Sequence, residues 1–588
     1  MNKAAIYHRP ESEFSFLFPD SDHLRIRIRT AINDAIKVEL FSSNLIESND
    51  NNWVECPIEM QKITTTPVFD YWVANIKEPI GHLPAYAFRI TDRQSKTILY
   101  CDQGFVSDNK SGYAIVQQHF FRMPYMHDID RFQAPEWVKN TIWYQIFPDR
   151  FSNGNHANDP EKTLDWQYES PKNDSFYGGD IQGIINKLGY LHQLGINGIY
   201  LTPIFKSPSN HKYDTEDYLE IDPNFGSKND FKNLIDKAHK LGIKIMIDAV
   251  FNHIGANSYQ WQDVLRNGAA SPFANWFHIS SFPIHLYHDK EPYPQNDYPQ
   301  KNYETFANAI NMPKWNTANP DVQKFLVQTA LYWTQQFQID GWRLDVANEV
   351  DHHFWREFRK AIKFVNPEIF IVGEVWHSSQ PWLNGDQFDS VMNYSTTDLI
   401  KEYFLLKKIK AVDFIYSFND RLMLYQDPTN QVMFNLLDSH DSPRIATVAN
   451  GNFSAVKSAL AFMFLQQGTP DIYYGTEYGM IGKSDPDSRR PMVWDKENQN
   501  QNMYQFVHTL ISIRKKYSQV IEDYSPRWHY ADAQEKGLIS FEKGHLIAHF
   551  SSKNTVLQDS GTILMGNNYQ QGKDQIILGE DGFCILER

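Results

Sequence analysis

The sequence predicts a chain of the α/β class: a central (β/α)8 TIM barrel flanked by an antiparallel β-sandwich on each side. Eight strand-like runs follow residue 141, and amphipathic helical segments separate most of them. Eight such units in one chain favour a closed barrel over an open sheet. Before and after this region, apolar and polar residues alternate with little helical periodicity, which is typical of antiparallel sheets.

The predicted regions follow one another without repeats. Residues 1–125 form the N-terminal sandwich, and a Pro-rich linker covers 126–140. The barrel occupies 141–516, and residues 254–311 are expected to form a small subdomain, because a βα loop is ordinarily much shorter. Residues 517–588 form the second sandwich. The barrel strands are expected in TIWYQIF, INGIYLT, IKIMIDAV, IDGWRLDV, IFIVGEV, DSVMNY, VMFNLL and DIYYGTE.

Composition excludes several classes of protein. The 588 residues are 41% hydrophobic with a formal charge of -15 and no concentrated Lys/Arg run, which argues against nucleic acid as a partner. Cys56, Cys101 and Cys584 are too few and too scattered for a disulfide framework or a zinc site, so a reducing compartment fits. The start lacks the apolar run of an export signal, and no later run is long enough to cross a bilayer. We therefore expect a cytoplasmic protein with no membrane partner.

Polar residues gather where the predicted barrel strands end. The carboxyl ends of barrel strands share one face, where active sites lie. A single acid at a strand end usually caps a helix or starts a turn. Several acids converging on one pocket repel one another, which is costly without a role. The set contains Asp248, Asn252, His253, Arg343, Asp345, Glu374, His440 and Asp441.

Three acids with one arginine and two histidines suit glycoside hydrolysis, in which one carboxylate attacks the anomeric carbon and a protonated one assists the leaving oxygen. Four segments also resemble, in order, the signature regions of the α-amylase superfamily of retaining α-glycosidases: DAVFNH, GWRLDVANEV, GEVW and LLDSHD. The resemblance makes Asp345 the nucleophile, Glu374 the general acid/base and Asp441 the third acid. It makes Arg343, His253 and His440 the residues that hold the nucleophile and the sugar.

Physical expectations accompany these roles. Arg343 and Asp345 are two residues apart on a strand and share a face, so Arg343 is expected to lower the pKa of Asp345 and keep it ionised. Glu374 must instead hold a proton, for which the neighbouring apolar Val375 and Trp376 are suitable.

Further motifs resemble the neopullulanases, cyclomaltodextrinases and maltogenic amylases. MPKWN (312–316) is similar to their MPKLN element, and Trp315 in place of leucine is expected to shape the acceptor side of the site. Tyr213 matches a tyrosine that stacks on the sugar, with a core tyrosine as the alternative. Asp485 and Arg489 match a pair that binds the next sugar, with a surface ion pair as the alternative. Trp376 is grouped with these substrate-binding residues.

A calcium site is also implied by resemblance. NGNHANDP (153–160) and YGGD (177–180) are similar to the calcium-binding segments of the same group, and clustered oxygens suit this ion. Asn155 stands where many relatives have aspartate, so weaker binding is expected. An Asn-rich turn without metal is the alternative. The ligands implied are Asn153, Asn155, Asn158, Asp159, Gly178 and Asp180.

The sequence therefore predicts a retaining hydrolase of α-1,4 bonds in cyclodextrins, maltooligosaccharides or pullulan, with some transglycosylation. The resemblance also implies a homodimer in which the N-terminal domain of one subunit lies over the active site of the other. Two alternatives stay open. One is an α-1,6-acting oligosaccharide glucosidase or glucosyltransferase of the same superfamily. The other is a non-catalytic carbohydrate-binding or interaction subunit, which the presence of all three acids and the arginine opposes.

Overall fold

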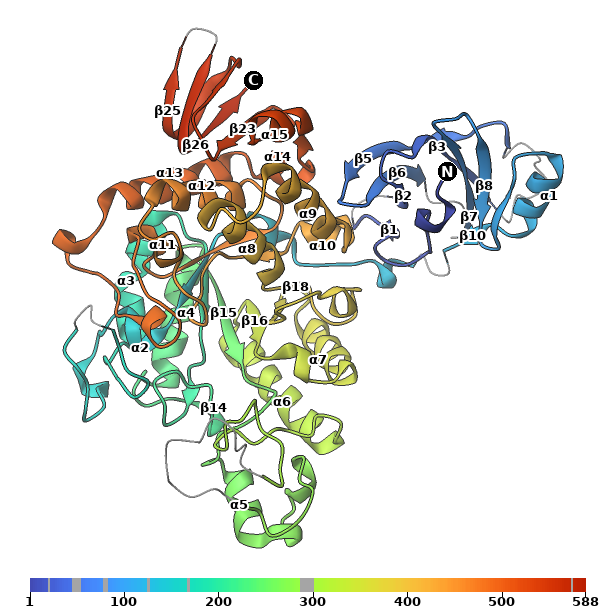
Figure 1. Cartoon of the computed structure of the whole chain (residues 1–588). Coiled ribbons are helices and arrows are strands. Elements are labelled where there is room, and N and C mark those ends of the chain that lie inside the picture. Colours follow the sequence, from blue (N-terminus) through green and yellow to red (C-terminus); the bar gives the residue numbers. More distant parts are fainter. Residues whose placement is uncertain are drawn as a thin grey trace.

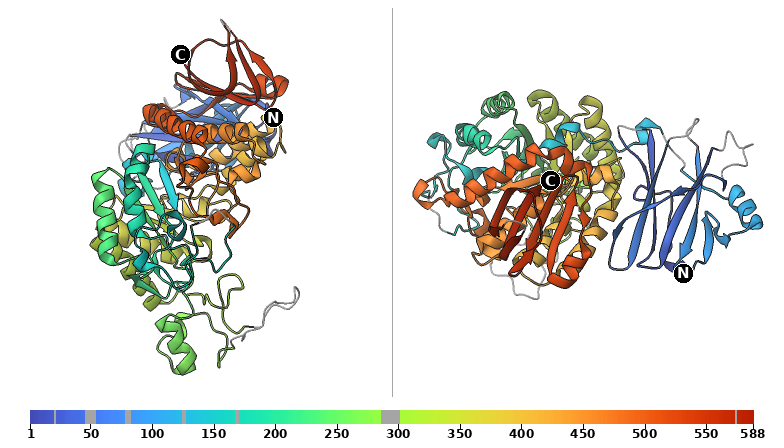
Figure 2. Two further views of the ribbon diagram at one scale, coloured as in Figure 1. Left: turned by 90° about the vertical axis from the view of Figure 1, so that its left-hand side faces the viewer. Right: turned by 90° about the horizontal axis from the view of Figure 1, so that it is seen from above.

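The computed structural model describes residues 1–19, 22–44, 54–77, 83–123, 127–166, 170–285, 301–572 and 575–588. An eight-stranded parallel sheet lies at the centre, and antiparallel sheets lie toward both ends of the chain, so the predicted fold class is confirmed. The N-terminal region packs against the side of the barrel, and the C-terminal sheet lies above the barrel in Figure 1. The view from above in Figure 2 shows the same side-by-side arrangement.

The N-terminal region contains two antiparallel sheets, ordered β1-β2-β6-β5 and β4-β3-β7-β8-β9, with β10 paired to β7. Apolar residues from both sheets, including Ile26, Ile28 and Phe88, form its core. One helix was not predicted: α1 (Lys110–Gln118) begins where the side chain of Asn109 accepts the Gly112 amide. The strands are β1 Ser15–Leu17, β2 His23–Ala31, β3 Ala35–Asn44, β4 Ile58–Glu59, β5 Gln61–Thr65, β6 Phe69–Lys77, β7 Pro84–Asp92, β8 Thr97–Cys101, β9 Gly104–Ser107 and β10 Phe121–Arg122.

The barrel strands run in the order β18-β17-β16-β15-β12-β11-β20-β19, and a parallel bridge between Met392 and Phe434 joins the two edges. Seven of the predicted strand segments contain one of them, and the eighth, DIYYGTE, overlaps the end of β20. Large side chains such as Trp143, Met246 and Phe370 cluster together in a packed core of their own. The strands are β11 Trp143–Ile146, β12 Gly198–Leu201, β15 Lys244–Ala249, β16 Gly341–Leu344, β17 Phe370–Gly373, β18 Ser390–Val391, β19 Phe434–Asn435 and β20 Thr469–Tyr473.

Helices surround the barrel, and most begin at a side chain that accepts a free backbone N–H of the first turn. Asp180, Ser227, Asn319, Asp351, Asn452 and Asn500 act in this way. Among the described residues, no helix has the length and apolar character needed to span a bilayer. The main helices are α3 Ile181–Leu194, α4 Lys228–Lys240, α6 Pro320–Phe337, α7 His352–Val365, α8 Tyr394–Ile400, α9 Ala411–Met423, α12 Phe453–Phe464 and α13 Gln501–Lys516.

The long connection after β15 contains the helix α5 (Tyr259–Asn267) and short bridges between its own segments, among them Phe277 with Trp315 and Ile279 with Tyr303. Residues 286–300 of this predicted subdomain lie outside the described residues. A further bridge pairs His253 with Lys314, which brings the end of the connection back to the carboxyl end of β15.

The C-terminal region is antiparallel, as predicted, but its described strands form one continuous sheet rather than the two sheets of the expected sandwich, because β26 pairs with β23, β24 and β25 alike. A short helix, α14 (Ser518–Asp523), leads from α13 to this sheet, and a second one, α15 (Tyr530–Lys536), lies between β21 and β22. The strands are β21 Arg527–Trp528, β22 Leu538–Lys543, β23 Leu546–Ser551, β24 Thr555–Leu557, β25 Thr562–Gln571 and β26 Ile576–Glu587.

The N-terminal region is joined to the barrel by a buried ion pair. Arg27 of β2 is fully buried, donates to the carbonyl oxygen of Tyr425 at 2.8 Å and pairs with Asp427 at the start of the short helix α10 (Asp427–Asn430). Arg25 pairs with the same carboxylate. A nearby hydrogen bond of 2.7 Å runs from Ser12 Oγ to Asn384 Oδ1, in the loop that follows β17.

Candidate active site

A cavity of about 490 Å³ opens where the barrel strands end. Its walls come from the loops after β15, β16 and β17 and from segments near residues 211, 306, 441 and 485. Arg343 and His440 are fully buried and contact acids of the cavity wall. The other predicted catalytic and sugar-binding residues, except Trp315, line the cavity directly: Tyr213, His253, Asp345, Glu374, Trp376, Asp441, Asp485 and Arg489.

At the bottom of this cavity, the guanidinium of Arg343 contacts three carboxylates. Arg343 Nη1 donates to Asp345 Oδ1 at 2.7 Å and to Asp248 Oδ2 at 2.9 Å. Its Nη2 lies 3.0 Å from Glu374 Oε2. The register of β15, β16 and β17 explains this meeting, because Asp248 is paired with Arg343 across parallel strands and Glu374 directly follows β17. The strand ends therefore bring together three acids and one cation.

The electrostatics of this cluster differ from the sequence prediction. Burial raises the pKa of Asp345 well above its usual value; Arg343 opposes this shift, while Glu374 and Asp248 add to it. Burial also raises the pKa of Asp248. The expectation that Arg343 gives Asp345 a low pKa is wrong in its net direction, because it left out burial, the largest cause of the shift, and the two other carboxylates that share the arginine.

Glu374 is held by donors on both carboxyl oxygens. Oε2 accepts the backbone N–H of Val346 at 2.8 Å, and Oε1 accepts the indole N–H of Trp376 at 3.0 Å. The ring of Trp376 stacks face to face on Tyr394, with centroids 3.7 Å apart and planes within 4°. Val346 has φ +46°, a left-handed conformation that costs roughly 1–3 kcal/mol for a non-glycine residue. This strain turns the amide that follows Asp345 toward Glu374.

Asp441 is set apart from the other acids by two partners of its own, His440 and Arg489. His440 Nε2 lies 3.0 Å from Oδ2, and Arg489 Nη2 donates to Oδ1 at 3.1 Å. Although burial acts to raise it, His440 and Arg489 bring the pKa of Asp441 below its usual value. Arg489 also pairs with Asp485 at 2.9 Å, and the arginine itself is buried, so this is not an ordinary surface ion pair. Asp441 is therefore a permanent acceptor at the cavity wall.

Tyr213 forms part of the cavity wall through its contacts with His440. The two rings are parallel within 5° at 5.4 Å, and the tyrosine hydroxyl donates to Asp248 Oδ2 at 3.1 Å. His253 lies on the other side, with Nε2 3.2 Å from the Tyr213 carbonyl oxygen. Burial lowers the pKa of His253 to about 3, so the ring is neutral at physiological pH. The predicted aromatic and imidazole groups are thus brought together.

Trp315 does not line the cavity, so the expectation that its side chain shapes the acceptor side of the site directly is wrong. Its side chain is 1% exposed, packs against Phe277 with centroids 4.7 Å apart, and donates to the Tyr218 hydroxyl at 3.1 Å. From the same motif, Met312 lines the cavity, and Lys314 pairs with Glu349 at 3.1 Å. The local bridge between residues 277 and 315 turns this tryptophan into the subdomain core.

Several cavity residues were not predicted from the sequence. Val346, Asn348 and Glu349 belong to the quoted GWRLDVANEV segment, so their position after a barrel strand was a usable signal. Phe306 comes from the long connection after β15. No periodicity in the sequence predicts that this connection returns to the site. It stacks on His253 with centroids 5.0 Å apart. His211 and His377 complete this set.

The six predicted calcium ligands also lie together, beside the end of β11. Asn153 Nδ2 donates to Asp159 Oδ1 at 2.7 Å, and Asn158 Nδ2 donates to Asp180 Oδ2 at 3.2 Å. Gly178 has φ +74°, and a Cβ there would lie 2.4 Å from Asp159 Oδ1. Asn153 Oδ1 is buried without a hydrogen-bond partner. Within the described residues, no group of three or more His, Cys, Asp or Glu side chains is arranged for a metal, so any ion here depends on amide and backbone oxygens.

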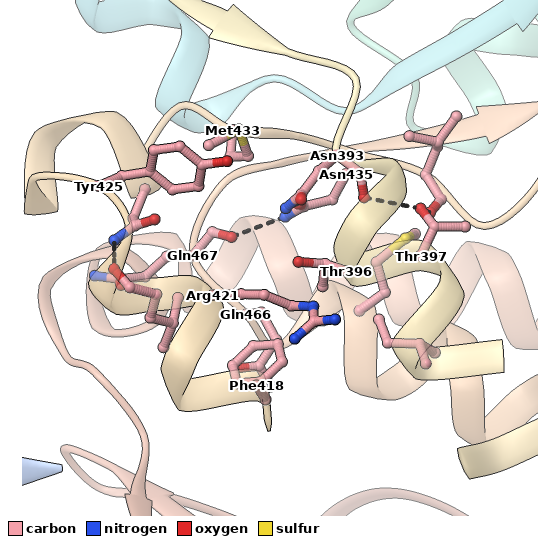
Figure 3. Close-up of a pocket in the computed structure, with 15 residues that line it drawn as sticks. Asn393, Thr396, Thr397, Phe418, Arg421, Tyr425, Met433, Asn435, Gln466 and Gln467 are labelled. Carbon is pink, nitrogen blue, oxygen red and sulfur yellow. Dashed lines mark hydrogen bonds between the residues drawn. The ribbon is translucent and has the colours of Figure 1, made fainter. Parts of the chain in front are cut away.

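A second cavity, between the barrel strands and the helices around them, is too small for a sugar. Figure 3 shows it between the ends of β18 and β19 and the helices α8 and α9. Its volume is about 20 Å³, whereas one water already needs roughly 10–15 Å³ by the same measure. Polar groups around it are bonded to one another: Asn435 Nδ2 donates to the Gln467 carbonyl oxygen at 2.8 Å. Of these two cavities, only the one around Asp345 has room for a sugar.

Comparisons with known proteins agree with this arrangement. The alpha amylase catalytic-domain family matches residues 145–523, and the alpha amylase N-terminal ig-like domain matches residues 1–127. The intracellular maltogenic amylase of Bacillus subtilis (strain 168) is 45% identical over 561 residues, which cover 95% of this chain and 92% of that protein. A cyclomaltodextrinase of Geobacillus thermopakistaniensis is 47% identical over 517 residues, 88% of this chain and 85% of that one. A solved cyclomaltodextrinase structure has a TM-score of 0.89 at 36% identity and covers 100% of both chains.

Proposed function

Because the chain belongs to the α-amylase family, we propose that it is a retaining α-glucan hydrolase acting on α-1,4 bonds of cyclodextrins, maltooligosaccharides or pullulan. Relatives that match most of this chain bear the names maltogenic amylase and cyclomaltodextrinase. The observation that carries the proposal is the set of acids at the end of the barrel: Asp345 and Glu374 share Arg343, while Asp441 pairs with Arg489.

In the proposed reaction, Asp345 attacks the anomeric carbon while Glu374 gives its proton to the departing glycosidic oxygen. The glycosyl ester on Asp345 is then hydrolysed by a water molecule from which Glu374 removes a proton, with net retention of configuration. Asp441, held as a carboxylate by His440 and Arg489, accepts hydrogen bonds from ring hydroxyls. A sugar acceptor that replaces the water gives transglycosylation.

Product profiles test this assignment. The purified protein is incubated separately with cyclodextrin, pullulan and isomaltose, and the products are separated by chromatography. We expect ring opening of cyclodextrin and cleavage of pullulan, together with minor transfer products. Cleavage of isomaltose without any action on cyclodextrin or pullulan would instead establish the α-1,6-acting alternative, and no cleavage at all would favour a binding subunit.

We also propose that the cluster around Asn153 holds a structural calcium ion. The cluster supplies oxygen donors only, as this hard cation prefers, and the buried Oδ1 of Asn153 has no other partner. Asp159, Asp180 and the Asn158 amide would provide further oxygens. When bound, the ion would tie the loop after β11 to the start of α3 and take no part in the chemistry.

Calcium is therefore expected to raise the melting temperature. At a free concentration about 100 times Kd, binding stabilises the folded state by about 2.7 kcal/mol. Differential scanning calorimetry with excess Ca²⁺ and with a chelator measures the shift. Asn155→Asp adds negative charge and should increase the response, whereas Asp159→Asn should reduce it. Identical melting curves with Ca²⁺ and with the chelator, in the unmodified chain and in Asn155→Asp, would contradict the proposal.

A homodimer in the cytoplasm completes the proposal. Among the described residues, none from 1–127 lines the cavity, so an N-terminal domain that narrows it would have to come from a second copy. The compartment is supported by the Bacillus subtilis relative, which is named an intracellular enzyme. Light scattering on a sizing column gives the mass in solution, and the mass of a single chain would exclude the dimer.

A further inference from the structure

Trp376 contacts Glu374 in a way that the proposed roles do not use. Its indole N–H donates to Glu374 Oε1 at 3.0 Å, while its ring lies flat on Tyr394. Tyr394 is 2% exposed, whereas Trp376 is 44% exposed. The tryptophan therefore has one face fixed on a buried ring, a second face open to the cavity, and its only polar atom on the carboxyl group of Glu374.

The other carboxyl oxygen of Glu374 is fixed from the opposite direction. Oε2 accepts the Val346 N–H and lies 3.0 Å from Arg343 Nη2. The backbone and the arginine thus orient Oε2 toward the interior, which leaves Oε1 as the oxygen that exchanges a proton with substrate. Trp376 is the protein donor on that oxygen, so it controls both the direction and the charge of the reacting atom.

We propose that Trp376 is a positioning residue for the proton transfers of Glu374, in addition to any contact it makes with sugar. This inference rests on the proposed function, in which Glu374 is the general acid/base. The stack on Tyr394 holds the indole plane, and the N–H holds the rotation of the carboxyl group about its last bond. A carboxyl rotated out of line loses proton-transfer efficiency, because that step depends on hydrogen-bond geometry.

The two proton transfers show what the Trp376 N–H contributes to the reaction. As the bond between the anomeric carbon and the glycosidic oxygen breaks, the electron pair stays on that oxygen, Asp345 forms the new bond to carbon, and Glu374 Oε1 gives its proton to the oxygen. Oε1 then becomes part of a carboxylate, which the Trp376 N–H stabilises. In the second half Oε1 takes a proton from water, and the charge disappears again. The hydrogen bond is thus strongest in the states in which Glu374 is ionised.

Leaving-group dependence separates this role from that of a sugar platform. Trp376→Phe keeps an aromatic ring for the stack on Tyr394 and removes the N–H. Maltotriose has a poor leaving group that needs the proton, whereas in α-maltosyl fluoride the fluoride departs without it. We expect kcat/KM for maltotriose, which reports the first step, to fall about 10- to 100-fold, a part of the 10²–10⁴ that general acid–base catalysis supplies. For the fluoride we expect kcat/KM to fall less than about 3-fold.

Trp382 provides a matched control, because it lies six residues further along the same loop and its indole N–H has no contact with Glu374. Trp382→Phe should leave the ratio of the two kcat/KM values unchanged. Equal losses on both substrates in Trp376→Phe, or a rise in KM alone, would overturn the inference. The Glu374→Gln variant, measured beside it, keeps the two ideas separate: if Glu374→Gln retains maltotriose hydrolysis, the proposed function fails, whatever Trp376→Phe does.

Discussion

Replacing Asp345 by asparagine is expected to lower kcat for cyclodextrin at least ~10³-fold, on the scale of removing a covalent nucleophile. The amide has nearly the shape of the carboxylate but cannot form the glycosyl ester. Sugar release by the purified variant is measured against the unmodified chain under saturating substrate. Unchanged sugar release would mean that the acids at the ends of β16 and β17 are not the catalytic centre.

The melting temperature of Asp345→Asn tests the charge balance of the cluster around Arg343. Asp345, Asp248 and Glu374 share the single cation Arg343, and burial acts to raise the pKa of Asp345. Removing one carboxyl group from a cluster with too little positive charge relieves repulsion, so the melting temperature of Asp345→Asn should equal or exceed that of the unmodified chain. Its loss of activity can then be assigned to chemistry. A clear drop in melting temperature would show that the carboxyl group stabilises the fold.

Glu374→Gln is expected to lower kcat for cyclodextrin ~10²- to 10⁴-fold, the range supplied by general acid–base catalysis. The Gln carbonyl oxygen can still accept the Val346 N–H, so the fold should be retained. The loss should be much smaller for α-maltosyl fluoride in the first step, because fluoride leaves without a proton. Steady-state rates on both substrates, with melting temperatures beside them, check this.

Azide gives a second readout for the same variant. The second step requires a base to activate water, but azide attacks the glycosyl ester as an anion and needs none. Added azide should therefore speed turnover of α-maltosyl fluoride and give an α-glycosyl azide, since the configuration is retained. Loss of activity on both substrates to the same degree, without an effect of azide, would assign Glu374 a different role.

The barrel could be predicted because its signal is local and repeated. Parallel strands buried on both faces read as continuous apolar runs, and the helices between them show a clear amphipathic period. The positions of Asp345, Glu374 and Asp441 at the cavity follow from the same reasoning, since parallel strands place their carboxyl ends together. Helix α1 was missed because it lies inside a long series of short strands and is fixed mainly by its Asn109 cap.

Features that depend on distant contacts could not be predicted in this way. Trp315 belongs to a motif that resembles a substrate-binding element, yet its direction is set by pairing with residue 277 far along the connection. The pKa of Asp345 depends first on its burial and then on Arg343, Glu374 and Asp248 together, not on Arg343 alone. The left-handed backbone conformation of Val346 could not be predicted from the sequence either, because β-branched residues ordinarily avoid this conformation.

The buried arginine between the N-terminal region and the barrel limits how this enzyme can be recombined with its relatives. Arg27 is fully buried, so water cannot solvate its charge when the ion pair is lost. Removing one partner of a buried ion pair typically costs 3–5 kcal/mol. A chimaera cut within the linker would separate Arg27 from Asp427 although both flanking folds were kept intact. A chimaera that exchanges the N-terminal domain therefore also has to exchange the helix at residue 427. The segment that must be transferred is larger than the domain that the sequence defines.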